Sequence, residues 1–218
     1  MWAKSPSRSS ASPVGELKLL TRFTGPGVAL LAATLLSAQT GPVRLPSEGV
    51  PAVVAGSLDL SGKNVNPFEM AGGKPLVLIF VRTDCPVSNR YAPTIQALTR
   101  KYAGRVLVAL VYPDKTETPA DIEKHLREYG YENTAIRDTQ HDLVKVSKVE
   151  ITPEAAVFNG KGQLIYHGRI DNWYKDFGHA RSAPTTHELD EAIQAALNST
   201  GPVPASVGGV GCYISDLQ

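Results

Sequence analysis

The 218-residue sequence has only two cysteines, no excess of charge of either sign and no apolar run of the length that crosses a membrane with ease. Two cysteines exclude a disulfide-rich scaffold and a four-cysteine zinc site. Because 22 Lys and Arg residues nearly balance 21 Asp and Glu residues, the chain lacks the basic excess typical of nucleic-acid-binding proteins. Its 42% of apolar residues is ordinary for a globular protein.

Residues 1–40 differ in character from the rest of the chain. Four Lys and Arg residues precede an apolar run at 28–38 that ends on small residues. A basic segment, a short apolar stretch and a small-residue exit are typical of a secretory signal peptide, and an uncleaved N-terminal anchor is the alternative. We therefore expect an exported protein, periplasmic or membrane-anchored facing the periplasm, in a compartment where disulfides form and persist.

The remainder is predicted to be one domain followed by a tail. Residues 48–200 have the length of a common single domain. From 201 to 218 the composition shifts to Gly, Pro and other small residues, which predicts a flexible C-terminal tail. Cys212, the second cysteine, lies in that tail.

The predicted strands and helices alternate along most of the domain. The apolar run 76–81 indicates a strand buried on both faces, and Pro86 opens a helix that Pro93 kinks and Gly104 ends. The other predicted elements are strands at 105–111, 133–137, 155–158 and 163–170 and helices at 118–129, 141–149 and 186–197. Alternation followed by a hairpin predicts an α/β fold, with a central mixed sheet and helices on both of its faces.

Cys85 follows the first buried strand and begins a helix. Unpaired amides and the positive end of a helix dipole favour a thiolate at such a position. Asp84 acts against the thiolate, whereas Arg82 and Arg90 favour it where their side chains turn inward. The alternative is that Cys85 is a small buried apolar residue. At Thr152-Pro153, a proline stands just before a predicted strand, where it cannot join the ladder.

Three segments together resemble the thioredoxin-like superfamily: LVLIFVRTDCPVSNRYAP, VLVALVYPD and VEITPEAAVFNGKGQLIYHGRID. The similarity extends over residues 50–197 and is closest to the redoxin group, which is related to alkyl hydroperoxide reductase/thiol-specific antioxidant proteins and to exported thiol–disulfide oxidoreductases. The resemblance implies a thioredoxin-like fold with Cys85 as the reactive cysteine. It also implies that Pro153 is a cis-proline that, with Thr152 before it, positions the substrate thiol.

The sequence departs from each of the relatives in this superfamily at one position or more. A Cys-x-x-Cys oxidoreductase has cysteine where this chain has Ser88, and a copper-delivering Sco-type protein has cysteine at Asn89. The peroxiredoxin pattern Pro-x-x-x-Thr-x-x-Cys meets Leu78 and Arg82 instead, with Thr83 one step off. The full activity of no single relative can therefore be assigned to this chain. Arg82, Thr83 and Arg90 are candidates for residues that support the Cys85 site.

Cys212 is the one other thiol available to Cys85, because the chain has no local partner cysteine. An extended tail from residue 201 reaches about 35–40 Å, which is enough to cross the domain. Three roles stay open for Cys212. It resolves Cys85 within the chain or across a dimer, it has a structural or metal-binding role, or it is an unpaired thiol that serves another partner.

A metal site in this chain would need histidine ligands beside the two cysteines. Cys85, Cys212 and a histidine could bind copper, but no two of these residues have a recognisable ligand spacing. The histidines are His125, His141, His167, His179 and His187, of which His141 and His167 are the better placed to face the site. We predict surface or core histidines, no metal and no other cofactor. The segment 169–174 is predicted to be a lid packed on the core, with a substrate groove as the alternative.

The sequence thus predicts a thiol-based oxidoreductase of the redoxin type, with Cys85 as nucleophile and Cys212 as a candidate resolving thiol. Thiol–disulfide exchange ranks ahead of peroxide reduction because the peroxide-orienting threonine is displaced. The expected partners are protein or low-molecular-weight thiols and disulfides, or peroxides, and not nucleic acid; such a protein would serve antioxidant defence and cell redox homeostasis. A Sco-like copper module and a non-catalytic interaction domain are the alternatives.

Overall fold

The computed structural model describes residues 56–199 and 202–215. The predicted signal peptide or anchor and the predicted start of the domain at residue 48 lie outside these residues. In the described part, no helix is long and apolar enough to cross a membrane.

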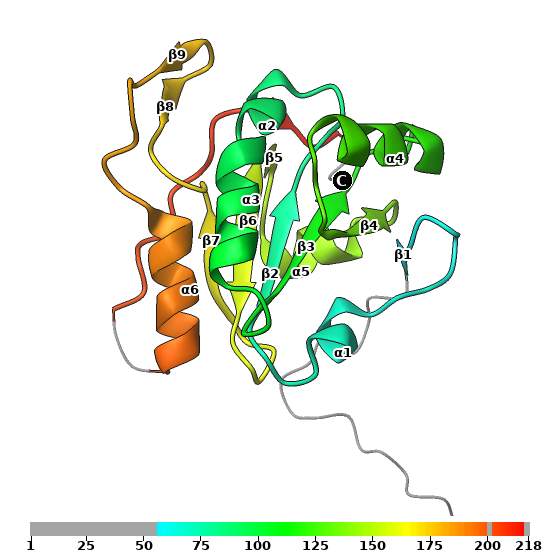
Figure 1. The fold of residues 1–218 in the computed structure, drawn as a ribbon, viewed down its shortest axis with the longest axis horizontal. Helices are drawn as coiled ribbons and strands as arrows, with labels where there is room; N and C mark the ends of the chain where they lie inside the picture. The colour runs from blue at the N-terminus through cyan, green and yellow to red at the C-terminus, as the bar shows by residue number, and fades with distance from the viewer. Residues whose placement is uncertain (1–55, 200–201, 216–218) are drawn as a thin grey trace, which may run out of the picture. The chain divides into compact units, whose positions relative to one another are not determined.

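A six-stranded mixed sheet with the order β1-β4-β3-β2-β6-β7 forms the centre of the domain (Figure 1). Strands β2, β3 and β4 are mutually parallel, while β1, β6 and β7 run antiparallel to their neighbours. The strands are β1 (Ser57–Leu58), β2 (Leu76–Phe80), β3 (Leu107–Tyr112), β4 (Thr134–Asp138), β6 (Glu154–Phe158) and β7 (Leu164–Gly168).

Helices cover both faces of this sheet, as the sequence predicts. They are α1 (Pro67–Ala71), α2 (Pro86–Arg90), α3 (Ala92–Lys101), α4 (Pro119–Glu128), α5 (Asp142–Ser147) and α6 (Glu188–Asn198). Along β2, Val77 and Ile79 pack in the cluster of α3, α4 and α6, and their neighbours Leu78 and Phe80 pack in the cluster of α1 and α5. Because successive side chains of a strand point to opposite faces, an unbroken apolar run is required here.

The helix predicted from Pro86 is in fact two helices, α2 and α3, which meet at Tyr91. The break lies two residues before Pro93, which cannot donate a helical hydrogen bond. The N–H of Tyr91 still reaches the carbonyls of Val87 and Ser88, so the two helices remain closely connected. Cys85 is therefore followed by the short helix α2 and not by one long kinked helix.

Two small pairs of strands were not expected from the sequence. Strand β8 (Tyr174–Asp176) pairs with β9 (His179–Ala180), and β5 (Ile151–Thr152) pairs with β10 (Cys212–Tyr213). The second pair differs from the predicted flexible tail, because residues 206–214 are bound along the domain. We call residues 206–214 the strap; in Figure 1 this segment, in red, passes behind α2 next to β5.

Candidate functional site

Cys85 lies between the end of β2 and the first turn of α2, where it is the N-cap residue. Its side chain is fully buried. The Sγ atom accepts a hydrogen bond from the backbone N–H of Ser88 at 3.5 Å, and the thiol donates to the backbone carbonyl of Thr152 at 3.2 Å. One local backbone group, at Ser88, and one distant in sequence, at Thr152, therefore orient the sulfur.

The strap brings Cys212 to the same place. Strand β10 pairs antiparallel with β5 so that Cys212 lies opposite Thr152, and the Thr152 hydroxyl donates to the Cys212 carbonyl at 3.3 Å. The Thr152–Pro153 peptide bond that follows is cis, as the resemblance implies. The thiols of Cys85 and Cys212 are free, and each shifts the pKa of the other. The structure thus unites the four residues Cys85, Thr152, Pro153 and Cys212.

The two thiols have opposite proton affinities. Burial by itself raises the pKa of Cys85, but hydrogen bonds from the Cys212 thiol and from Ser88 stabilise the thiolate, and the net pKa is lowered. Burial, followed by the hydrogen bond to Cys85, raises the pKa of Cys212 to about 12. Cys85 is therefore the more acidic thiol of the pair, and Cys212 is the thiol that keeps its proton.

A frame of polar side chains holds the turn before Cys85. Glu117 accepts a hydrogen bond from the N–H of Thr83 at 2.6 Å, and the Asn89 amide donates to the Thr83 carbonyl at 3.0 Å. The Nε2 atom of His125 lies 2.8 Å from the Asn89 carbonyl oxygen, and its Nδ1 atom lies 2.9 Å from the Tyr112 hydroxyl. Both peptide groups of Thr83 are therefore fixed by side chains from other parts of the chain.

The same frame determines how His125 is protonated. Because Asn89 presents its oxygen to Nε2, that nitrogen carries the proton, and Nδ1 accepts from Tyr112. Burial lowers the pKa of His125 to about 4, so the ring is neutral at pH 7. Burial raises the pKa of Glu117, against the opposing effect of the Thr83 N–H. The sequence contained no spacing or motif that marks Glu117, Asn89 and His125 as a group.

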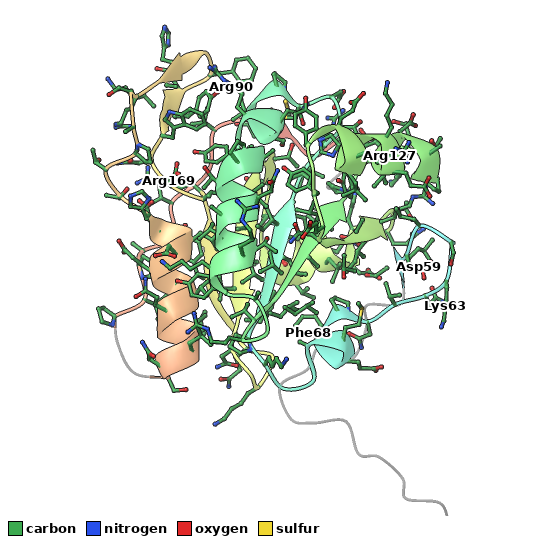
Figure 2. The ribbon with its side chains drawn as sticks, viewed as in Figure 1. Asp59, Lys63, Phe68, Arg90, Arg127 and Arg169 are labelled. Carbon is green, nitrogen blue, oxygen red and sulfur yellow. The ribbon has the colours of Figure 1, made fainter. Side chains whose placement is uncertain are left out.

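The two arginines that were candidate supports have other partners. Arg82 forms ion pairs at 3.0 Å with both Asp84 and Asp114. The guanidinium of Arg90 lies over the ring of Trp173, 5.8 Å from its centre, beneath the β8–β9 hairpin (Figure 2). Neither is a hydrogen-bond partner of the Cys85 sulfur among the described residues. Thr83 supports the turn through its backbone.

The contacts of the other histidines are with groups other than the two cysteines. His141 is buried and bonds to the Pro113 carbonyl, and His179 pairs with Asp176. The backbone N–H of His167 donates to the Ser206 hydroxyl. His187 precedes α6 as its N-cap residue. Within residues 56–199 and 202–215, no group of three or more His, Cys, Asp and Glu side chains is arranged to hold a metal ion.

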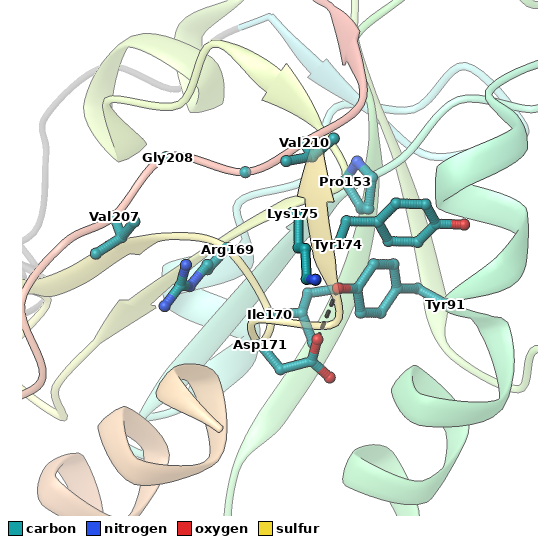
Figure 3. A pocket seen from close by; sticks show the side chains of 11 residues that line it. Tyr91, Pro153, Arg169, Ile170, Asp171, Tyr174, Lys175, Val207, Gly208 and Val210 are labelled. Carbon is teal, nitrogen blue, oxygen red and sulfur yellow. Dashed lines mark hydrogen bonds between the residues drawn. The ribbon is translucent and has the colours of Figure 1, made fainter. Parts of the chain in front are cut away.

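A cavity of about 200 Å³ lies beside the cis-proline, between the strap and the segment that follows β7 (Figure 3). Tyr91 donates to Asp171 at 2.7 Å across its floor, and its ring packs against Trp173 and Tyr174. The segment 169–174 therefore packs on the domain, as predicted for a lid, and also lines a pocket. The residues around the cavity are Tyr91, Pro153, Arg169–Asp171, Tyr174, Lys175 and Val207–Val210.

Comparison with known proteins gives a family and a fold. The redoxin family model matches residues 46–177, more than half of the chain. Similar solved structures include a hypothetical protein of Sinorhizobium meliloti (TM-score 0.62, 20% identity, covering 72% of this chain and 87% of that one). Others are MTB dsbF in its mixed oxidized and reduced forms (0.50, 20%, 69% and 99%) and a thioredoxin-like protein of Porphyromonas gingivalis (0.50, 19%, 70% and 94%). No curated protein matches. The neighbours show a thioredoxin-like fold.

Proposed function

Because this chain belongs to the redoxin family, and so has a thiol-based redox function, we propose that it catalyses thiol–disulfide exchange, with Cys85 as nucleophile and Cys212 as resolving thiol. One observation carries the proposal. Cys212 lies opposite Thr152, whose carbonyl accepts from the buried thiol of Cys85, and the two thiols shift each other's pKa. A reactive cysteine without a neighbouring partner in sequence has thereby acquired one in space.

The exchange proceeds in two displacements. The Cys85 thiolate attacks one sulfur of a partner disulfide, a new S–S bond forms to Cys85, and the other partner sulfur leaves as a thiolate that takes a proton from water. Cys212 then attacks the Cys85 sulfur as its own proton passes to the departing second partner thiolate. The partner disulfide gains two electrons and two protons, and the chain is oxidised to a Cys85–Cys212 disulfide. The reverse sequence oxidises a partner dithiol.

The surroundings of the sulfur support exchange over peroxide reduction. In the described part of the chain, the hydrogen-bond partners of the Cys85 sulfur are the Ser88 N–H and the Thr152 carbonyl. No threonine hydroxyl among them is available to orient a peroxide, and the backbone of Thr83 is engaged by Glu117 and Asn89. The proposed partners are protein or low-molecular-weight disulfides, and the proposed location is the exported compartment indicated by residues 1–40.

Thiol trapping followed by mass spectrometry tests the proposal. The reduced protein is mixed with a small excess of oxidised glutathione or, in parallel, of hydrogen peroxide, and free thiols are alkylated after quenching. We expect a Cys85–Cys212 disulfide with glutathione disulfide, and no such disulfide in the Cys85→Ser variant. A Cys85 that stays free under both oxidants would overturn the catalytic role. A Cys85–glutathione adduct that never yields the internal disulfide would overturn the resolving role alone.

A further inference from the structure

The strap occupies the edge of β5 directly before the cis-proline. We propose that the strap fills the protein's own partner-binding site, and that this site, once the strap leaves, binds an extended partner segment with the pattern Gly-x-Gly-Cys. The inference rests on the proposed exchange reaction and adds the recognition of its protein substrate. The strap itself carries the pattern, as Gly209-Val210-Gly211-Cys212.

Backbone groups make most of the polar contacts of the strap. The N–H of Arg169 donates to the Val207 carbonyl at 2.8 Å, and the N–H of Ile214 donates to the Glu150 carbonyl at 2.9 Å. Between these two points β10 pairs with β5 at Cys212. Any extended segment offers the same backbone donors and acceptors, so a second chain can replace the strap by adding a strand at this edge.

Glycine is required where the strap lies closest to the cis-proline loop. A Cβ atom on Gly211 would lie 1.9 Å from the Thr152 carbonyl oxygen, and one on Gly209 would lie 2.9 Å from the Pro153 carbonyl oxygen. A Cβ atom on Gly208 would meet its nearest atom at 3.7 Å, an ordinary contact. The site therefore selects glycine one and three positions before the cysteine.

Glu154 supplies the side-chain contact of this site. Glu154 is 4% exposed; one carboxylate oxygen accepts from the N–H groups of Glu150 and Ile151, and the other accepts from the N–H of Gly209 at 2.6 Å. The second oxygen exchanges this backbone donor for water when the strap leaves. The backbone N–H of a bound partner segment would restore it.

The strap is anchored lightly enough to leave without unfolding the domain. Val207 and Tyr213 are 40% and 73% exposed, whereas Ile214 is the one deeply buried apolar side chain in the segment. Local release at low cost is the behaviour of segments with few buried apolar contacts. Because Cys85 is fully buried under the closed strap, release is also the route by which a partner reaches its sulfur.

A matched pair of glycine substitutions in the full-length reduced protein tests the strap. Gly211→Ala must displace the strap, whereas Gly208→Ala has space for the methyl group. The measurement is the rate at which iodoacetamide alkylates Cys85, followed by mass spectrometry of the Cys85 peptide. We expect at least a tenfold faster rate in Gly211→Ala and a rate within twofold of the original protein in Gly208→Ala. Equal rates in the two variants would overturn the proposal.

Binding of a synthetic peptide tests recognition of a partner. The probe is a fluorescent peptide of residues 206–214 carrying Cys212→Ser, so that no disulfide can form. We expect it to bind Gly211→Ala protein at least tenfold more tightly than the original protein, and we expect its own Gly211→Ala version not to bind. Failure of the first peptide to bind, or equal binding of both, would overturn the proposal. Should Gly211→Ala protein not fold, Ile214→Ala protein, which loses the buried apolar anchor of the strap, takes its place in both assays.

Failure of this inference and failure of the proposed exchange reaction give different experimental results. A strap that shields Cys85 and a peptide that binds, in a protein that never forms the Cys85–Cys212 disulfide, would sustain this inference and reject Cys212 as resolving thiol. If the original protein forms the Cys85–Cys212 disulfide normally but its Cys85 is alkylated as fast as in Gly211→Ala, the resolving role of Cys212 stands and the inference about the strap is rejected.

Discussion

The two cysteines are held by two different kinds of structure. Cys85 belongs to a frame of buried side chains in which Glu117 and Asn89 fix the turn at Thr83 and His125 fixes Asn89. Cys212 belongs to a strap held mainly by backbone contacts, close enough only because glycines precede it. One sulfur is thereby immobile and the other can depart. This is the division expected between a nucleophile and a thiol that either resolves it or gives way to a partner.

Removing the Cys212 thiol from the strap has the largest expected effect. In Cys212→Ser, the mixed disulfide between Cys85 and glutathione has no internal thiol to break it, so we expect it to persist at least a hundredfold longer than in the original protein. The measurement is the mass of the adduct over time after a brief exposure to oxidised glutathione, with Cys85→Ser as the control that forms no adduct at Cys85. Equal lifetimes with and without Cys212 would mean that the strap serves no resolving role.

The strand and helix around Cys85 were more predictable from the sequence than the strap. An apolar run, Cys85 and then Pro86 define a buried strand and the first turn of a helix, and each of these follows from local sequence preference. The hairpin at Asn159 follows in the same way from its Asn-Gly turn. Local patterns therefore located Cys85, whereas the cis-proline at Pro153 came from the resemblance to the superfamily.

The strap was not predictable from its composition. Its Gly-rich sequence is typical of a flexible tail, and the contacts that order it are made with Thr152 and Glu154, more than fifty residues earlier in the chain. Glycine permits close approach of two backbones as readily as it permits flexibility. Only the position of β5 shows which of these two properties is used here.

Closeness to Cys85 in the sequence was a poor guide to which side chains hold the turn. Arg90 lies five residues after Cys85, but its side chain extends to Trp173. The residues that do fix the turn come from α2, from the loop before α4 and from α4 itself, and polar residues in such places have no periodic pattern. Side-chain networks of this type depend on tertiary contacts that a single sequence does not encode locally.

Breaking the frame at its centre has the next largest effect. Asn89→Ala removes the donor to the Thr83 carbonyl and leaves the buried Nε2–H of His125 without an acceptor. We expect the free energy of unfolding to fall by about 2 kcal/mol. Urea denaturation measures it, and Asn64→Ala, at an exposed amide, is the control that should be nearly neutral. A loss in Asn89→Ala no greater than in the control would mean that the network does not stabilise the turn.

The smallest effect is a pH dependence that belongs to the frame alone. The folded protein keeps His125 neutral because burial lowers its pKa to about 4, whereas the unfolded chain takes up a proton near its ordinary pKa of 6.5. The unfolded state therefore binds more protons as the pH falls, and stability decreases on going from pH 7 to pH 5.5 by about 1 kcal/mol from this residue. His125→Gln cannot titrate, so its urea-unfolding free energy should decrease by that much less over the same interval. Glu117 and Asp138, whose pKa values burial raises, are common to both proteins and cancel in the comparison. Identical pH profiles for the two proteins would mean that burial does not keep His125 neutral in the folded protein.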